Sequence, residues 1–545
     1  MAKLGLCSRC KGVNAKARPV ACTMLEGGPC SVCKEREAIR EKIGQLEEEI
    51  TQLKAKHHAL GSRMNEIHDP FIHKLPPEVG SHIFRLCFPT FYFEDVDRWS
   101  KAAAFTRVLR LGAVCRKWRQ LAWATPDLWD TLYFMISPLT KRSLVQWLPG
   151  LLHEWLSRSG MRPLTIFFRY FGCSQESDYS SSDDEVAHGS LIETLNSAVE
   201  VVIEVINSHS GRWRNLHLDV SGDIHERLCG SIQPNQLRFL ELGIDGETLA
   251  TPKFTMKSKP FPTQLTFDNF SPTSIDIGWD NITRAVLFNL NANECLDVLR
   301  RTPTLEYCLA ESWDDAWGDA TVNLGTTIHP HLRSLDISYG GTTFLDAINV
   351  PSLEEWIHNT GGAHLPLAAM VSLIQRSGCC LKILNLKHIS ELPDDLFILF
   401  QAMLSLEHLQ LHFRSVQNAQ GVMDGILARI FNSPPANSAI PEETFSKSFL
   451  PRLQFMEIRT LATAPFSWNH LPQLYRQGHR RSLTLKSAAK ESHISDDTAL
   501  ELLKLTDEGV DLQILDTTTR AGGDFLENFR KKIRSLSSTD SLQRK

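Results

Sequence analysis

Apolar residues follow a heptad rhythm between residues 39 and 67, where they recur in alternating steps of four and three. The members of this series are Ile39, Ile43, Leu46, Ile50, Leu53, His57, Leu60, Met64 and Ile67. Because Glu, Lys and Gln fill most positions between them, the pattern predicts a coiled-coil helix over 37–68 with one narrow apolar seam. Such a seam needs a second helix, and either coiled-coil dimerisation or the protein's own surface would supply one. Asp69-Pro70 should end the helix, because proline lacks the amide donor.

A second, strongly apolar region follows over residues 71–132. Leu75-Pro76-Pro77-Glu78 is a helix opening, since proline is tolerated in the first turn and Glu78 complements the helix dipole. Further on, Val114, Trp118 and Leu121 are spaced by four and three residues, which predicts the apolar face of another helix. We therefore expect a small three-helix domain here.

The long C-terminal part repeats a pattern of the type Leu-x-x-Leu-x-Leu. Its segments start at Trp213, Leu237, Leu305, Leu332, Leu353, Leu381, Leu406 and Leu453. From 305 to 406 the starts are 27, 21, 28 and 25 residues apart, which suits one strand, a turn and a helix per unit, with helices near 292–299 and 394–400. The longer gaps elsewhere indicate degenerate units or insertions.

These elements predict an α/β fold class (α+β overall), with an irregular leucine-rich-repeat-like solenoid over 140–520. The alternative is a doubly wound α/β domain with leucine-rich strands. We favour the repeat interpretation, because no phosphate-binding glycine loop follows any expected strand. Alternation along the strands would turn polar side chains outward, as a face that binds a target or is merely solvated. Those residues are Ser334, Asp336, Asn385, Lys387, His408, Gln410 and His412, with Asn215, His217 and Ser338 in the same positions.

The region 71–132 resembles the F-box in three motifs: LPPEV at 75–79, the IF pair at 83–84 and VCRKW at 114–118. The spacing between the motifs is longer than in a minimal F-box. The order of coiled coil, F-box and irregular leucine-rich units also resembles a fungal class of F-box proteins. The resemblance implies docking on a Skp-family adaptor, and through it a cullin-RING ubiquitin ligase. The docking candidates it carries over are Leu75, Pro76, Pro77, Glu78, Val79, Ile83, Phe84, Val114, Cys115 and Trp118.

Cysteines cluster in the N-terminal segment 1–36, as Cys7-x-x-Cys10 and Cys30-x-x-Cys33. This spacing lies within the range of four-thiolate zinc sites. We weigh a structural zinc there against free thiols, and favour the thiols. With Cys22, the run also faintly resembles a fungal binuclear zinc cluster, but a sixth cysteine is missing. No other cofactor is indicated.

Composition changes this picture little. The chain of 545 residues has a net charge of −5, which does not favour nucleic acid or membrane partners, and 13 cysteines, an odd count typical of thiols in a reducing compartment. We therefore expect a cytoplasmic or nuclear protein. Residues 174–190 are acidic and serine-rich and should form a solvated loop, and 530–545 should be a flexible tail. No catalytic signature appears, so we do not expect an enzyme.

Together these features favour a substrate-recognition subunit of a Skp-cullin-F-box ligase, which binds the adaptor through the F-box and an unknown protein target through the repeats. Two alternatives stay open. One is a zinc-dependent, nucleic-acid-binding regulator that dimerises through its coiled coil. The other is an F-box scaffold that binds the adaptor but degrades nothing.

Overall fold

The computed structural model describes most of the chain. The described residues are 31–68, 75–88, 107–137, 140–170, 185–244, 252–311, 325–339, 341–390, 395–414, 420–434, 449–460, 466–480, 482–489, 494–516 and 523–543. The chain divides into two compact units, Met1–Thr125 and Pro126–Lys545. Each unit is described by itself below.

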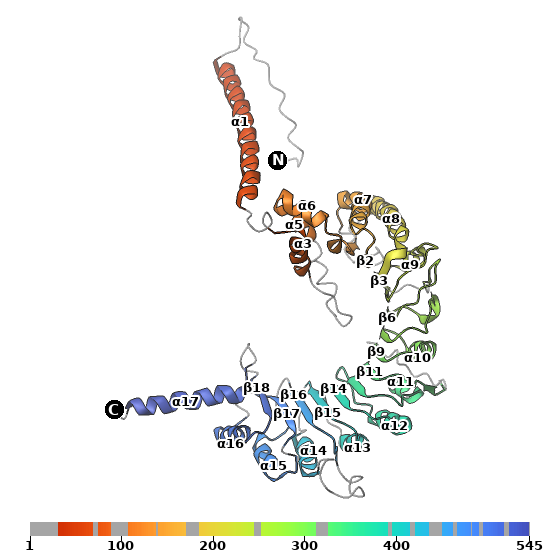
Figure 1. Ribbon diagram of the computed structural model, residues 1–545, viewed down its shortest axis with the longest axis vertical. Coiled ribbons are helices and arrows are strands. Elements are labelled where there is room, and N and C mark those ends of the chain that lie inside the picture. Colours follow the sequence, from red (N-terminus) through yellow and green to blue (C-terminus); the bar gives the residue numbers. More distant parts are fainter. Residues whose placement is uncertain are drawn as a thin grey trace. The chain divides into compact units, whose positions relative to one another are not determined.

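The first unit is helical throughout its described part (Figure 1). Its helices are α1 (Ser31–His68), α3 (Pro77–Leu86), α5 (Arg107–Val114) and α6 (Arg116–Trp123). Helix α1 begins before residue 37, where the heptad pattern placed its start. All the apolar seam positions of α1 are exposed, from 45% at Leu46 to 69% at Ile67. The seam therefore finds no partner within the described residues of one chain.

Helices α5 and α6 correct one expectation from the sequence. We expected Val114, Trp118 and Leu121 on one continuous helix, but the helix is interrupted at Cys115. The backbone of Cys115 is extended, and its Sγ accepts a hydrogen bond from the Trp118 amide at 3.4 Å. Cys115 thus caps α6, while Val114 ends α5. A spacing rule cannot detect such a break, because both short helices keep the same rhythm.

The second unit contains a sheet of 14 strands in which each strand pairs in parallel with the next strand of the sheet. In order these are β1 (Thr131–Ile136), β2 (Leu164–Tyr170), β3 (Trp213–Asp219), β4 (Phe239–Gly243), β6 (Gln264–Asp268), β8 (Arg284–Phe288), β9 (Tyr307–Glu311), β11 (Ser334–Ser338), β13 (Glu355–Asn359), β14 (Ile383–Ile389), β15 (His408–Phe413), β16 (Phe455–Thr460), β17 (Thr484–Ala489) and β18 (Leu512–Asp516). Two short parallel pairs lie beside it: β5 (Phe254–Thr255) with β7 (Ile275–Asp276), and β10 (Thr327–Ile328) with β12 (Ile348–Asn349).

Parallel strands need crossover connections, and helices supply most of them here. They are α7 (Arg142–Arg158), α8 (Glu185–Ser208), α9 (Gly222–Arg227), α10 (Ala292–Arg301), α11 (Thr342–Ala347), α12 (Leu367–Ser377), α13 (Leu396–Gln401), α14 (Gln420–Asn432), α15 (Leu471–Gln477) and α16 (Asp496–Asp507), with α17 (Phe525–Gln543) after the last strand. In Figure 1, helices α10 and α12 to α15 all lie on one side of the sheet. Single 3₁₀ turns occur at Pro126–Leu128, Ser210–Arg212, Pro272–Ser274 and Trp468–His470.

Burial alternates along several strands, as expected of a sheet with one covered face. On β15, for example, Leu409, Leu411 and Phe413 are buried, whereas the residues between them are half-buried. All eight segments with the leucine pattern contain a strand. The longest gap in the pattern is not an insertion, because it holds two further strands of the 14-stranded sheet, β6 and β8. The pattern missed them because Pro262 and Ile282 stand where a leucine was sought.

Two predicted irregular regions are partly helical. Helix α8 begins at Glu185, inside the stretch 174–190 that we expected to be a solvated loop; residues 174–184 lie outside the described part. Helix α17 extends to Gln543, where we expected a flexible tail. Its first turns carry Phe525, Leu526 and Phe529, which are at most 7% exposed. These buried residues lie between the predicted solenoid, which ended at residue 520, and the predicted tail, which began at residue 530.

Candidate functional site

Helix α3 carries an exposed apolar ridge made of Val79, Ile83 and Leu86. These side chains are spaced by four and three residues, so they follow one another along one face of the helix. Their exposed fractions are 42%, 44% and 71%. Exposed aliphatic side chains in a continuous row are typical of a surface that binds a partner. We call this row the α3 ridge.

The opposite face of α3 packs against α6. At Gly80 an added Cβ would lie 2.6 Å from Cδ2 of Leu121, so any side chain here would require Leu121 to move. Phe84 is 2% exposed, and its ring lies 5.0 Å from that of Trp118. The Ser81 and Thr125 hydroxyls form a hydrogen bond of 2.7 Å on the same side. Phe84 was named as a docking residue, and its burial corrects that assignment: it belongs to the core of the domain.

The beginning of α3 contributes little apolar surface of its own. Pro76, Pro77 and Glu78 are exposed, and Leu75 is half-buried. The carbonyl of Pro76 accepts hydrogen bonds from the amides of Val79 and Gly80, so this segment shapes the first turn of the helix. A contact of these four residues with an adaptor stays a prediction.

Helices α5 and α6 add further exposed apolar side chains. Leu109, Val114 and Trp123 are 44%, 51% and 43% exposed. Arg119 Nε donates to the Gly112 carbonyl at 2.7 Å and so fixes α6 against α5. Cys115 and Trp118, both docking candidates, are half-buried. Leu86, Leu109 and Trp123 were not among the docking candidates, although Leu86 could have been found by extending the row from Val79.

A comparison with protein families identifies this region. A model described as F-box-like matches residues 72–135. A comparison with curated proteins found no match to the chain. The chain therefore carries an F-box-like domain, and such domains typically bind Skp-type adaptors. This suggests an adaptor-binding subunit of a Skp-cullin-F-box-type ligase.

The matched region runs beyond the helices of the first unit into the start of the second. Its last residues include Trp129, which is 1% exposed, and strand β1. The ring of Trp129 packs edge-on against Trp155 at 4.7 Å, and the Arg158 guanidinium lies 4.7 Å from its centroid. The end of the F-box-like region is thus built into the first strand and helix of the sheet unit.

The sheet face opposite helices α10 and α12 to α15 brings together the predicted target-binding residues. Asp336, Ile357, Asn385 and Gln410 are register neighbours on four adjacent strands. Two residues before Asp336, on the same face, the Ser334 hydroxyl donates to the Glu355 carboxylate at 2.8 Å. The whole predicted set Ser334, Asp336, Asn385, Lys387, His408, Gln410 and His412 lies on this face, half-buried except for Asn385, which is 9% exposed. Whether the face binds a target stays a prediction.

Carboxylates with perturbed pKa values line the centre of this face. Burial raises the pKa of Asp336 to about 6, against the lowering effect of Lys387, with Glu355 adding to the rise. Burial also raises the pKa of Asp268, and that of Glu311, where repulsion from Asp336 adds to the effect. This strip therefore holds three carboxylates whose charged forms are disfavoured, chiefly by burial. At its far side, burial lowers the pKa of His412, and the positive charge of Arg459 adds to the lowering.

On the first strands of this face, the polar side chains are paired more completely with one another. The His217 ring stacks on Phe167 at 4.0 Å and its Nδ1 lies 2.6 Å from the Glu241 carboxylate, while Arg169 and Asp219 form an ion pair of 2.6 Å beside it. His217 is 6% exposed. His217 was expected to point outward, but its neighbours cover it almost completely. Since these side chains satisfy one another, the first strands offer fewer open groups than the central ones.

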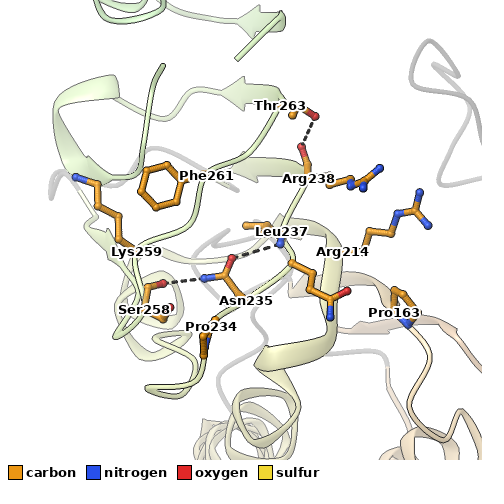
Figure 2. A pocket seen from close by; sticks show the side chains of 11 residues that line it. Pro163, Arg214, Pro234, Asn235, Leu237, Arg238, Ser258, Lys259, Phe261 and Thr263 are labelled. Atoms are coloured by element: carbon orange, nitrogen blue, oxygen red, sulfur yellow. Dashed lines mark hydrogen bonds between the residues drawn. The ribbon is translucent and has the colours of Figure 1, made fainter. Parts of the chain in front are cut away.

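A cavity of about 600 Å³ opens near the edge of the sheet where β3, β4 and β6 begin (Figure 2). Its lining includes Arg214, Arg238, Lys259 and Phe261. Asn235 fixes the wall, because its amide donates to the Ser258 carbonyl at 2.9 Å and its Oδ1 accepts from the Leu237 amide at 3.3 Å. This cavity could not be predicted from the sequence, because its residues come from separate loops and strand starts.

The cationic side chains that line the cavity differ in whether a carboxylate pairs with them. Lys259 pairs with Asp276 at 2.7 Å. Arg214 and Arg238 lie side by side, since the Arg238 amide donates to the Arg214 carbonyl at 2.8 Å. Within the described part of the chain, neither guanidinium forms an ion pair. The cavity thus presents two adjacent positive charges without a carboxylate partner.

The same sheet edge is neutralised further along. Equivalent positions at the starts of successive strands hold Glu306, Arg333, Glu354, Lys382 and Glu407. From Arg333 onward, the amide of each member donates to the carbonyl of the member before it in this row, at 2.8 Å. The signs alternate along this row, and Lys382 pairs with Glu354 at 3.1 Å. Adjacent opposite charges on a sheet are favourable, and adjacent like charges are not. Arg214 and Arg238 therefore depart from the pattern that the rest of the edge follows.

The four cysteines of the predicted zinc site are not described well enough to test it. Cys7, Cys10 and Cys30 lie outside the described residues, and Cys33 lies in α1 with its side chain outside the description. Among described side chains there is no cluster of His, Cys, Asp or Glu that could hold a metal ion. The described helices include none long and apolar enough to cross a membrane.

Proposed function

We propose that this protein is the target-recognition subunit of a Skp-cullin-F-box ubiquitin ligase, with the α3 ridge as its adaptor contact. The observation that carries the proposal is the ridge itself: Val79, Ile83 and Leu86 remain exposed on a domain whose F-box-like identity comes from an independent comparison. Amphipathic helices commonly bind by inserting such a row into an apolar groove. The chain itself would contribute no catalytic residue, and it would act in the cytoplasm or nucleus.

Binding of the full chain to a purified Skp-family adaptor tests the adaptor contact. We expect Ile83→Asp to weaken the complex at least about tenfold, because a charge would have to be buried in an apolar contact. Ile232→Asp is the matched control, since Ile232 is 84% exposed and belongs to the other unit. Equal affinity of the Ile83→Asp variant and the parent would refute the proposed contact.

The sheet unit is the proposed target receptor. Its sheet of 14 parallel strands, with helices on one side, supports a leucine-rich-repeat-like solenoid, a class that commonly binds proteins along its strand face. The cavity at Arg214 and Arg238 would accept an acidic group of the target, because two guanidinium groups without an ion-pair partner in the described part of the chain favour a carboxylate or phosphate. Phe261, which is 55% exposed, would contact an adjoining apolar side chain.

A glutamate-rich peptide is a direct probe of the cavity. We expect the full chain to bind it in a salt-sensitive manner, and Arg214→Glu/Arg238→Glu to abolish that binding. Arg333→Glu is the matched control, since Arg333 lies at the same edge between two glutamates. If the peptide does not bind, or if the control loses binding equally, the cavity is not the acidic-group site. Failure of this test leaves the adaptor contact, which has its own assay, unaffected.

A further inference from the structure

Helix α1 presents a complete two-stranded interface on a single helix. Written as a heptad abcdefg, its seam places Ile39, Leu46, Leu53, Leu60 and Ile67 at d, and Ile43, Ile50, His57 and Met64 at a. Every one of these aliphatic positions is at least 45% exposed. β-Branched residues at a combined with leucine at d favour parallel dimers over higher oligomers.

The charges that flank the seam identify the second helix. In a parallel coiled coil, position g of one helix faces position e of the following heptad in its partner. In a pairing of α1 with an identical, in-register copy, Lys42 would face Glu47, and Glu49 would face Lys54. One heptad earlier, Glu35 would face Arg40 by the same rule. Of the five g–e pairs in α1, the first three are therefore all of opposite sign with respect to another copy of the same helix, while the last two join Lys56 to Gly61 and Arg63 to His68.

Arg40 also bonds Glu37 within its own helix, with Nη1 donating to the carboxylate at 2.7 Å. A guanidinium has five donors, so this bond leaves donors for a second carboxylate. His57 would meet its own copy at an a position. A single polar residue at a specifies register and oligomer state at some cost in stability. The seam therefore contains a residue that specifies the register, His57, as well as apolar side chains whose burial drives association.

A lone α1 has little to stabilise it. Its interior holds Gly44 and Gly61, and each glycine costs a helix about 1 kcal/mol relative to alanine. Isolated helices are marginal in water even without such residues. Pairing would bury the seam and compensate for both glycines. We propose that the protein is a homodimer, joined by a parallel, in-register, two-stranded coiled coil of α1.

Charge reversal on the full chain tests the partner, its orientation and its register together. A g variant (Lys42→Glu/Glu49→Lys) and an e variant (Glu47→Lys/Lys54→Glu) each place like charges opposite one another in their own homodimers. Because each homodimer would exchange four attractive pairs for repulsive ones, we expect its dissociation constant to rise on the order of a hundredfold. A mixture of the two variants recreates all four attractive pairs and should form a heterodimer of parental affinity.

Light scattering coupled to size-exclusion chromatography measures the mass at micromolar concentration, and one tagged partner detects the heterodimer. The parent should have twice the mass of one chain. A monomeric or trimeric parent, variants that dimerise as well as the parent, or a mixture without heterodimer would each overturn the proposal. In particular, an antiparallel pairing joins g to g and e to e, so it would not produce selective pairing of the g and e variants. A Lys42→Arg variant keeps the charge and should leave the dimer unchanged.

Discussion

Asp336 should make the stability of the sheet unit depend on pH, in the direction opposite to an ordinary paired carboxylate. Its pKa is raised from 3.8 to about 6, chiefly by burial, so the folded protein disfavours the charged form. Between these two values the folded state binds more protons than the unfolded state, and stability falls as the pH rises. The cost is absent below the unfolded pKa and complete above the folded one. Asp336→Asn removes the charge while keeping the shape.

The shift of about two units, at 1.36 kcal/mol per unit, corresponds to about 3 kcal/mol. Because the side chain is only half-buried, solvent reduces this figure, and we expect Asp336→Asn to stabilise the protein by about 1–3 kcal/mol at pH 8. The gain should decline through pH 6 and approach zero near pH 4.

Urea unfolding of the full chain from pH 4 to pH 8, followed by circular dichroism, measures the difference between variant and parent. Asp280→Asn is the control, since Asp280 is an exposed carboxylate on the same unit and its replacement should change little at any pH. A gain that is constant with pH, or that grows toward acid, would show that the buried charge of Asp336 is not the cause.

A helix cap and a glycine with positive φ give two further predictions. Asn291 caps α10 by accepting from the Glu294 amide at 3.0 Å, so Asn291→Ala should lower the free energy of unfolding by about 1 kcal/mol in the same assay, whereas Asn291→Ser should keep most of it. Gly361 has a φ of +62°, and an added Cβ would clash with the Tyr339 ring, so Gly361→Ala should cost about 1–3 kcal/mol. A melting temperature of Gly361→Ala equal to the parent's would contradict the strain.

Much of the secondary structure could be predicted because it depends on local periodicity. A heptad spacing defines α1, and the leucine pattern located eight of the strands of the large sheet. Two others, β6 and β8, were missed because a strand needs only apolar side chains of fitting size, and proline or isoleucine serves at a position where the pattern demanded leucine. The break at Cys115 was missed for a related reason, since a cap changes the backbone without changing the spacing.

The surfaces were harder to predict, because they depend on which strands become neighbours. His217 is covered because Glu241, 24 residues away, is its register neighbour on the next strand. Phe84 follows directly after Ile83, yet it points into the domain while Ile83 stays exposed. Sequence alone identified the correct stretch of helix but could not say which side of it α6 would cover.

The arginine pair at the sheet edge could not be found from composition, because it depends on which strands become neighbours. The chain as a whole is slightly acidic, and carboxylates are plentiful enough to neutralise every edge position. Glu306 and Glu354 flank Arg333 in this way, whereas Arg214 and Arg238 stand together around a cavity of about 600 Å³. Adjacent like charges weaken a sheet, so an empty cavity leaves the fold less stable than a neutralised one would. An acidic peptide that binds there should therefore raise the unfolding temperature of the parent by mass action, and should not do so for Arg214→Glu/Arg238→Glu.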